Sequence, residues 1–283
     1  MTEIDAGPLD DHTRRIAMTA LRSLAFNIAF YVNLIVLMIL GLPLILLGRH
    51  GVFFMARLWG STSTWLLAAI CGLRIEYRGL ENIPEGGYIL AAKHESFLET
   101  FALLKYAPDF AIVLKKELVF IPIFGLYLVG ARQIAINRSR GHTALAQIIS
   151  QAREVLRGDR QVFIFPEGTR RPPGAPPRYK YGVTAIYAET AAPCLPVALN
   201  TGLFWGRRGF TRRPGVAVIE YLPPIPPGLE RGAFAERLQE TIETACRRLA
   251  AEAVAADPRL APILAAGAAT VDAVGANEIR SQA

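Results

Sequence analysis

The longest uncharged stretch of the chain runs from Ser23 to Gly48, between Arg22 and Arg49. Its length exceeds the roughly 20 residues that a membrane-spanning helix needs. Polar and helix-breaking residues interrupt it, namely Asn27, Asn33, Gly41 and Pro43. The stretch therefore predicts a membrane-embedded helix that either spans the bilayer or bends and dips into it.

A cleaved signal peptide is the alternative interpretation of this stretch. The apolar region is too long for one, and no small-residue cleavage site follows it. A second uncharged run, Leu58 to Leu73, is short for a membrane span and carries Trp59 and Trp65. Interfacial aromatic residues of this kind favour a position at the level of the lipid headgroups.

From about Arg74 onward, short apolar runs alternate with amphipathic stretches. Strands are predicted where these runs are rich in Val, Ile and Tyr, at residues 73–79, 87–92, 110–115, 132–137, 161–165, 193–199 and 215–222. Apolar residues at helical spacing predict helices over residues 97–107, 141–157, 182–190 and 232–255. Strands interleaved with helices indicate an α/β fold, with a mixed central sheet flanked by helices.

These patterns divide the chain into successive parts. We expect a polar N-terminal segment at 1–22, a membrane-anchoring helical region at 23–73 and an α/β domain at 74–257. The tail at 258–283 is rich in Ala and Gly, which predicts a weak helix or a frayed end.

Composition favours a membrane partner over nucleic acid. The 283 residues are 52% hydrophobic and only 19% charged, and the formal net charge is +7. Anionic lipid headgroups attract such a chain, whereas nucleic-acid binding needs a basic stripe with interleaved aromatic residues, which is absent from the sequence. Neither the cysteines nor the histidines have metal-ligand spacing, so we expect no metal and no cofactor.

The three cysteines, Cys71, Cys194 and Cys246, are scattered in apolar surroundings. Sparse, unpaired thiols of this kind are typical of a reduced protein interior. We therefore expect the α/β part of the chain to face the cytoplasm.

The segment KHESFLET, residues 93–100, follows a predicted strand and contains a candidate acid–base pair. Ser96 and Glu99 have the spacing of a helix capping box, in which Glu99 binds the Ser96 amide. Alternatively, Glu99 orients His94, which then acts as a general base. The two side chains would not share a face of one helix, so His94 must lie in the loop and Glu99 in the first helical turn.

A second candidate site follows the strand at 161–165. The chain continues into Pro166–Arg170 and then places Arg171, Arg178 and Lys180 in a loop rich in Pro and Gly. Cations and glycines at the end of a strand suit a phosphate site, with Arg170 and Lys180 as the best candidates. A solvated basic loop is the alternative. Arg138, which ends another predicted strand, is a further candidate anion ligand.

Together these motifs resemble the 1-acylglycerol-3-phosphate acyltransferase family of lysophospholipid acyltransferases. The His-x4-acid motif is His94 and Glu99, with Glu where the family usually has Asp. The second motif ends at Arg138, the third, FPEGTR, is unaltered at residues 165–170, and the fourth lies around Pro196. They occur in family order over residues 80–200, and the combination of the first and third is specific.

The resemblance implies transfer of an acyl group from acyl-CoA or acyl-carrier protein to a lysophospholipid hydroxyl. The favoured acceptor is 1-acylglycerol-3-phosphate, which would give phosphatidic acid. His94, oriented by Glu99, would deprotonate the hydroxyl. The remaining candidate site residues would bind the acceptor or orient the groups that do, and they are Arg138, Glu167, Gly168, Thr169, Arg170 and, from composition, Lys180.

Two other functions stay open at this point. One is acyl transfer to another lysolipid, such as a lyso-ornithine lipid. The other is a non-catalytic membrane protein that binds anionic lipid through the basic loop and has no need of the His94–Glu99 pair. In each case the expected location is the inner, cytoplasmic membrane.

Overall fold

The computed structural model describes residues 11–136 and 142–269. Within these residues the strands form a 7-stranded sheet in the order β1-β7-β6-β2-β5-β3-β4. Their bounds are β1 Leu73–Arg78, β2 Ile89–Ala92, β3 Phe110–Lys115, β4 Ile134–Ile136, β5 Gln161–Ile164, β6 Cys194–Leu199 and β7 Gly215–Tyr221. Each lies within a strand predicted from the sequence.

The centre of the sheet is parallel. β6, β2, β5, β3 and β4 run in one direction, whereas β7 is antiparallel to β6 and β1 is parallel to β7. β2 and β6 are buried at every position, as is usual for parallel strands covered on both faces. The predicted α/β fold with a mixed sheet is therefore confirmed.

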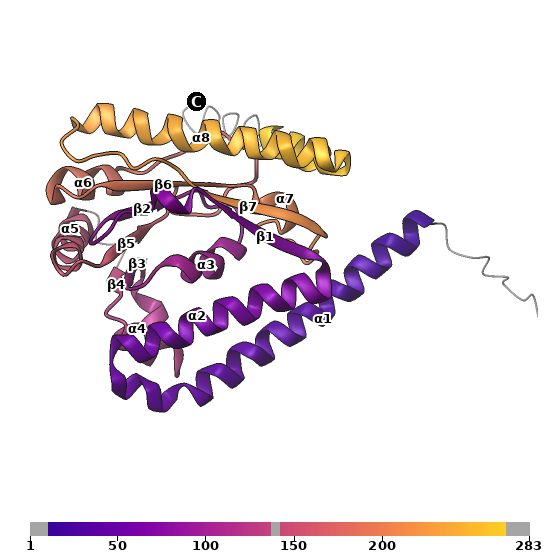
Figure 1. Ribbon diagram of the computed structural model, residues 1–283, viewed down its shortest axis with the longest axis horizontal. Coiled ribbons are helices and arrows are strands. Elements are labelled where there is room, and N and C mark those ends of the chain that lie inside the picture. Colours follow the sequence, from indigo (N-terminus) through magenta and orange to yellow (C-terminus); the bar gives the residue numbers. More distant parts are fainter. Residues whose placement is uncertain (1–10, 137–141, 270–283) are drawn as a thin grey trace, which may run out of the picture.

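Helices cover both faces of the sheet (Figure 1). On one face lie α5 (His142–Arg157), α6 (Tyr181–Thr190) and α8 (Arg231–Ala256). The other face is covered by α1 (Asp11–Leu40), α2 (Arg49–Leu66) and α3 (Leu98–Ala102). Two shorter helices, α4 (Phe124–Gly130) and α7 (Thr201–Phe204), complete the set named in Figure 1.

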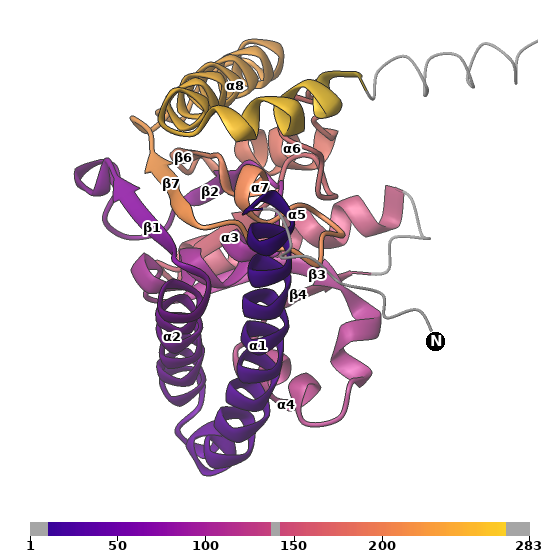
Figure 2. The ribbon, with the colours of Figure 1, turned by 90° about the vertical axis from the view of Figure 1, so that its right-hand side faces the viewer.

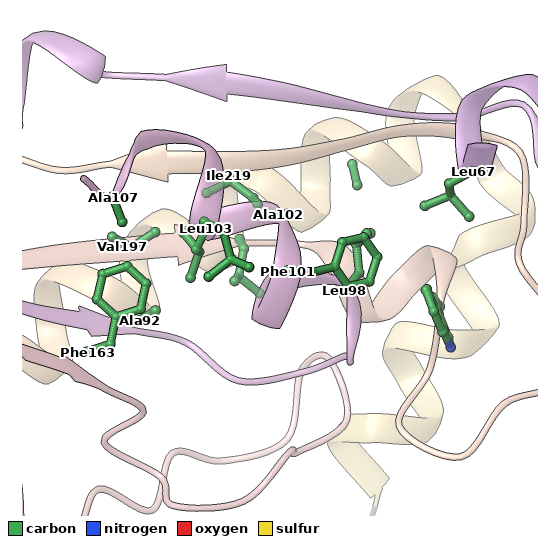
Figure 3. Packing of buried hydrophobic residues seen from close by; sticks show 14 of the residues in the cluster. Leu67, Ala92, Leu98, Phe101, Ala102, Leu103, Ala107, Phe163, Val197 and Ile219 are labelled. Atoms are coloured by element: carbon green, nitrogen blue, oxygen red, sulfur yellow. The ribbon is translucent and has the colours of Figure 1, made fainter. Parts of the chain in front are cut away.

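Helix α3 lies between the sheet and the N-terminal helices. Figure 3 shows Leu98 and Phe101 of α3, and Leu103 just after it, in the same buried cluster as Val197 and Ile219 of the sheet. On the side toward α2, a Cβ added to Gly60 would lie 2.7 Å from the Phe101 carbonyl oxygen. This close packing fixes the short helix that carries Glu99.

Helices α1 and α2 lie side by side as a hairpin (Figure 2). Residues Leu42–Leu47 connect them as a 3₁₀ turn, so the apolar stretch bends after α1 instead of continuing as one helix. Gly41 and Pro43 explain this end, because both disfavour a continuing helix. Asn33 donates hydrogen bonds to Thr62 and Ser63 of α2, which satisfies a polar group inside the hairpin.

The outer face of α1 exposes large apolar side chains. They include Ile16, Leu21, Ile28, Val32, Ile35 and Ile39. In the described part of the chain, Thr13–Leu40 is the only helical stretch whose length and apolar character would suit a membrane crossing. Phe26 and Phe30 on the opposite face of α1 are buried against the domain.

The first part of the C-terminal tail packs on the domain. Residues 261–269 are helical and Leu260 is buried. A Cβ on Gly267 would lie 1.8 Å from the Pro173 carbonyl oxygen, and Leu264 lies against Gly174. Of the two possibilities predicted for the tail, a weak helix or a frayed end, the helix is observed at residues 261–269. The division of the chain into domains stays a prediction.

Candidate active site

Three adjacent parallel strands deliver the candidate residues to one edge of the sheet. β2 pairs with β5 on one side and with β6 on the other. The chain therefore leaves the sheet at neighbouring points at Lys93, Phe165 and Asn200. Ligand sites of α/β proteins commonly lie beyond such carboxyl ends.

His94 and Glu99 form a hydrogen-bonded pair. The His94 Nδ1 atom lies 2.9 Å from Glu99 Oε1. The Glu99 side chain is fully buried, whereas 16% of the His94 side chain remains exposed. Because Nδ1 donates to the carboxylate, this network assigns the proton to Nδ1 and leaves Nε2 free to accept one.

Glu99 caps the helix and orients the histidine at the same time. Its Oε1 atom accepts hydrogen bonds from the amides of Glu95, at 2.8 Å, and Ser96, at 2.7 Å. The Ser96 hydroxyl accepts from the Leu98 amide, one residue earlier than the predicted capping box would place this bond. The two predicted roles of Glu99 are therefore compatible in one geometry.

Thr201 and Phe165 complete the surroundings of the pair. The Thr201 hydroxyl donates to Glu99 Oε2 at 2.8 Å, so both carboxylate oxygens are held. The Phe165 ring stacks on the His94 ring, with centroids 3.9 Å apart and planes inclined by 18°. Phe165 begins the FPEGTR motif, which thus fixes the plane of the imidazole.

A buried ionic network lies directly behind His94. Lys93 Nζ donates to Glu167 Oε1 at 2.9 Å and to Glu243 Oε1 at 2.8 Å. Tyr179 also donates to Glu243, at 3.0 Å. Burial acts to lower the pKa of Lys93, but attraction to the two carboxylates outweighs burial and the net pKa is raised. Lys93 is therefore charged at neutral pH.

Glu167 connects this network to the loop that carries His94. The His94 amide donates to Glu167 Oε2 at 3.4 Å, and the Arg171 amide donates to the His94 carbonyl at 2.8 Å. Glu167 is buried among these donors, so its geometry favours orienting Lys93. The resemblance in the sequence had left Arg170, a lysine or an acceptor hydroxyl as the group that Glu167 orients. Arg170 is not its partner.

Glu95 is the second buried acid next to the pair. Its Oε2 atom accepts from the Gly202 amide at 3.1 Å. Burial raises the pKa of Glu95 to about 8, with the nearby Lys93 charge opposing the shift. Glu95 is therefore largely protonated at neutral pH and does not compete with Glu99 as a negative group.

The candidate anion ligands lie on the loop that follows β5. Thr169 is exposed and Arg170 half-buried, and within the described residues the Arg170 guanidinium forms no ion pair. Gly168 has φ 65°, and a Cβ there would lie 3.1 Å from Lys180 Nζ, so glycine lets Lys180 lie over the loop. Arg138 lies outside the described residues.

Comparisons with known proteins place this site in a family. The family model described as "Acyltransferase" matches residues 74–200. The 1-acyl-sn-glycerol-3-phosphate acyltransferase of Pseudomonas aeruginosa is 38% identical over 172 residues, which cover 61% of this chain and 67% of that protein. The chain belongs to the acyltransferase family. The resemblance found in the sequence is thereby confirmed.

Two further comparisons agree with this assignment. The chloroplastic 1-acyl-sn-glycerol-3-phosphate acyltransferase LPAT1 of Arabidopsis thaliana is 31% identical over 199 residues, covering 67% of this chain and 54% of that protein. The crystal structure of the 1-acyl-sn-glycerophosphate acyltransferase PlsC from Thermotoga maritima matches with a TM-score of 0.68 and 23% identity. That match covers 81% of this chain and 96% of the other, and it supports the fold of the acyltransferase.

Sequence reasoning missed several residues that hold the acyltransferase site together. Lys93, Thr201, Tyr179 and Glu243 carry no motif spacing of their own. The position of Lys93 could nevertheless have been recognised as important, since a lysine directly after an entirely apolar strand requires a buried counter-ion. Its partner Glu243 could not be named, because it lies 150 residues away in the sequence.

Replacing Glu99 by Gln is expected to lower the turnover of the acyltransferase about 100-fold or more, with little change in melting temperature. Gln retains an acceptor for the Glu95 and Ser96 amides, so the helix cap survives. It cannot stabilise an imidazolium at His94. Steady-state kinetics and thermal unfolding on the same preparations test this expectation.

The matched control is Glu99→Asp, which keeps the carboxylate and should recover part of the lost rate. If Glu99→Gln keeps near-normal turnover, Glu99 serves only as a cap.

Proposed function

We propose that this acyltransferase moves a fatty acyl group from acyl-CoA or acyl-carrier protein to the free hydroxyl of 1-acylglycerol-3-phosphate, giving phosphatidic acid. The observation that carries the proposal is the His94–Glu99 pair, partly open to solvent and adjacent to a loop of cations. The named activities of the Pseudomonas and Arabidopsis relatives support the same acceptor.

The pair suits direct transfer without an acyl-enzyme. His94 Nε2 removes the proton from the acceptor hydroxyl, and the oxygen attacks the thioester carbonyl carbon. The new C–O bond forms, the C–S bond then breaks, and the leaving thiolate takes up a proton from the imidazolium or from solvent. Glu99 stabilises the imidazolium between these steps, as an acid partner of histidine does in general base catalysis.

The acceptor phosphate is bound by the loop after β5. Arg170 and Lys180 are its principal cations, the backbone at Gly168 allows close approach and the Thr169 hydroxyl adds a donor. Arg138 remains a predicted further ligand. Glu167 acts as a positioning residue, because its contacts are with Lys93, the His94 amide and, at 3.7 Å, the Arg171 guanidinium.

The membrane placement follows from the chemistry of the acceptor and the surface of α1. Both the acceptor and the product are lipids, so the site must open at a bilayer surface. The exposed apolar side chains of α1 provide the anchor. The cysteines among the described residues are free and buried, which supports a domain on the cytoplasmic side of the inner membrane.

The test is a transfer assay with purified, full-length protein. Labelled acyl-CoA and acyl-carrier protein are offered with a panel of acceptors, namely 1-acylglycerol-3-phosphate, a lyso-ornithine lipid and a monoacylglycerol without phosphate. Labelled phosphatidic acid is expected. Transfer only to the lyso-ornithine lipid would reassign the acceptor, and no transfer to any lysolipid would leave a non-catalytic lipid-binding protein.

Replacing Arg170 by Ala is expected to raise the KM for 1-acylglycerol-3-phosphate at least about tenfold, because one charge-assisted contact to phosphate is lost. The KM for the acyl donor should change little. Initial rates over a range of acceptor concentrations measure this effect. Arg157→Ala, which removes an exposed arginine from α5, is the control. Equal effects of the two variants on acceptor KM would contradict the assignment of Arg170.

A further inference from the structure

A second basic loop, separate from the one after β5, follows α7. We call residues 206–213, GRRGFTRR, the arginine loop. Arg207, Arg208 and Phe210 are exposed, and 50% of the Phe210 surface is accessible. The loop thus presents an exposed aromatic ring flanked by exposed arginines.

The arginine loop is tied to helix α1 through Arg212. The Arg212 amide donates to the Ser23 hydroxyl at 2.9 Å. Its guanidinium lies 4.1 Å from the centre of the Trp205 ring and 5.6 Å from that of Phe26, and it donates to the Phe210 carbonyl. This arrangement holds the exposed tip beside the apolar helix.

Within the described residues, no acidic side chain pairs with the arginines of the arginine loop. The sequence has no acidic residue between Thr13 and Ile75, and none in the arginine loop. In the parts of the chain that the structure describes, Arg207 and Arg208 form no ion pair, and the buried Nε of Arg212 has no hydrogen-bond partner. Burial lowers the pKa of Arg212, which reflects the cost of a buried cation without a carboxylate.

Cations, an exposed ring and an apolar helix together match the chemistry of one partner, an anionic lipid surface. Arginine donors suit phosphate oxygens, and aromatic rings favour the headgroup region. Arg14, Arg15 and Arg22 of α1 add positive charge on the same helix that contacts the loop.

We propose that the arginine loop is a docking surface for anionic phospholipid headgroups, in which Arg207 and Arg208 bind lipid phosphates and Phe210 enters the interface beside α1. This proposal rests on the membrane placement proposed above. It makes the attachment of the enzyme sensitive to lipid charge, independently of the acceptor site.

The test measures binding of the full-length chain to vesicles of phosphatidylcholine alone and to vesicles containing about one third phosphatidylglycerol. The wild type should bind the anionic vesicles more tightly, and added salt should remove the difference. The double variant Arg207→Gln/Arg208→Gln should lose about 25-fold in affinity for the anionic vesicles, roughly fivefold per arginine, with no change for neutral vesicles. Phe210→Ala should weaken binding to both.

The control is Arg157→Gln/Arg237→Gln, which removes the same charge from exposed positions on α5 and α8. An equal loss in this control, or unchanged affinity of the Arg207/Arg208 variant, would overturn the proposal. So would equal binding of the wild type to both kinds of vesicle. If the wild type binds neither, the membrane placement fails as well, whereas the transfer assay tests the catalytic proposal separately.

Discussion

Acyl transfer by the His94→Ala variant is expected to fall by about 10²–10⁴-fold, the usual contribution of a positioned general base. The structure places the partly exposed imidazole between the buried Glu99 carboxylate and solvent. Initial rates with saturating labelled acyl thioester and 1-acylglycerol-3-phosphate measure the loss.

Two controls separate a catalytic loss from a folding defect. His50→Ala removes an exposed histidine of α2 and should leave the rate unchanged. Vesicle binding and the melting temperature of His94→Ala should stay close to those of the wild type. The change removes the stacking on Phe165 and one hydrogen bond to Glu99, whose carboxylate keeps two backbone amides and the Thr201 hydroxyl as partners. Activity of His94→Ala above about one tenth of the wild-type rate would exclude His94 as the general base.

The largest expected effect on stability comes from Lys93→Met. This change removes the cation that both Glu167 and Glu243 bind, and it leaves two carboxylates without their partner in a buried site. Breaking a buried pair in this way costs about 3–5 kcal/mol of unfolding free energy. Urea unfolding at neutral pH measures the change, with Lys116→Met, an exposed lysine, as the control.

A compensating variant sharpens this prediction. Lys93→Met combined with Glu167→Gln and Glu243→Gln removes the unpaired charges and should recover much of the stability. If Lys93→Met unfolds no more easily than the Lys116 control, the buried network does not depend on Lys93. Failure of the triple variant to recover would show that packing, rather than charge, accounts for the loss.

The central strands β2 and β6 were predictable because they are buried along their whole length. Both are apolar at every position, and Gly87 or Pro193 stands shortly before each, so their runs are recognisable in the sequence. His94 was predictable for a related reason, since it lies in the loop just after β2, separated from the strand by Lys93. The hydrogen bond to Glu99 also followed from local geometry, because a loop residue and a first-turn residue five positions apart can meet.

The contacts that support the pair could not be predicted in the same way. Glu243 reaches Lys93 from α8, and Thr201 reaches Glu99 from α7, so both depend on the order of strands in the sheet. Sequence spacing carries no information about such long-range pairing. In the uncharged stretch from Ser23 to Gly48, Gly41 and Pro43 marked the position where α1 ends and the chain bends. The packing of α1 against α2 as a hairpin could not be predicted from it.

The structure also shows how a glutamate is accommodated at position 99, where the resemblance in the sequence implies an aspartate. Glu99 starts a helix that is packed between the sheet and α2, and its longer side chain turns back to the preceding loop. There its carboxylate accepts hydrogen bonds from two backbone amides, from the Thr201 hydroxyl and from the His94 ring. The glutamate side chain therefore binds the amides of the loop and the histidine at the same time.

The central claim is that Glu99 acts through His94, and a double-mutant cycle tests it most directly. Turnover is measured for the wild type, His94→Ala, Glu99→Gln and the double variant, each with an unchanged melting temperature. If the carboxylate works only by orienting and stabilising the imidazole, the double variant will be as slow as His94→Ala alone. If the two losses multiply instead, Glu99 contributes independently of His94 and the proposed catalytic pair is wrong.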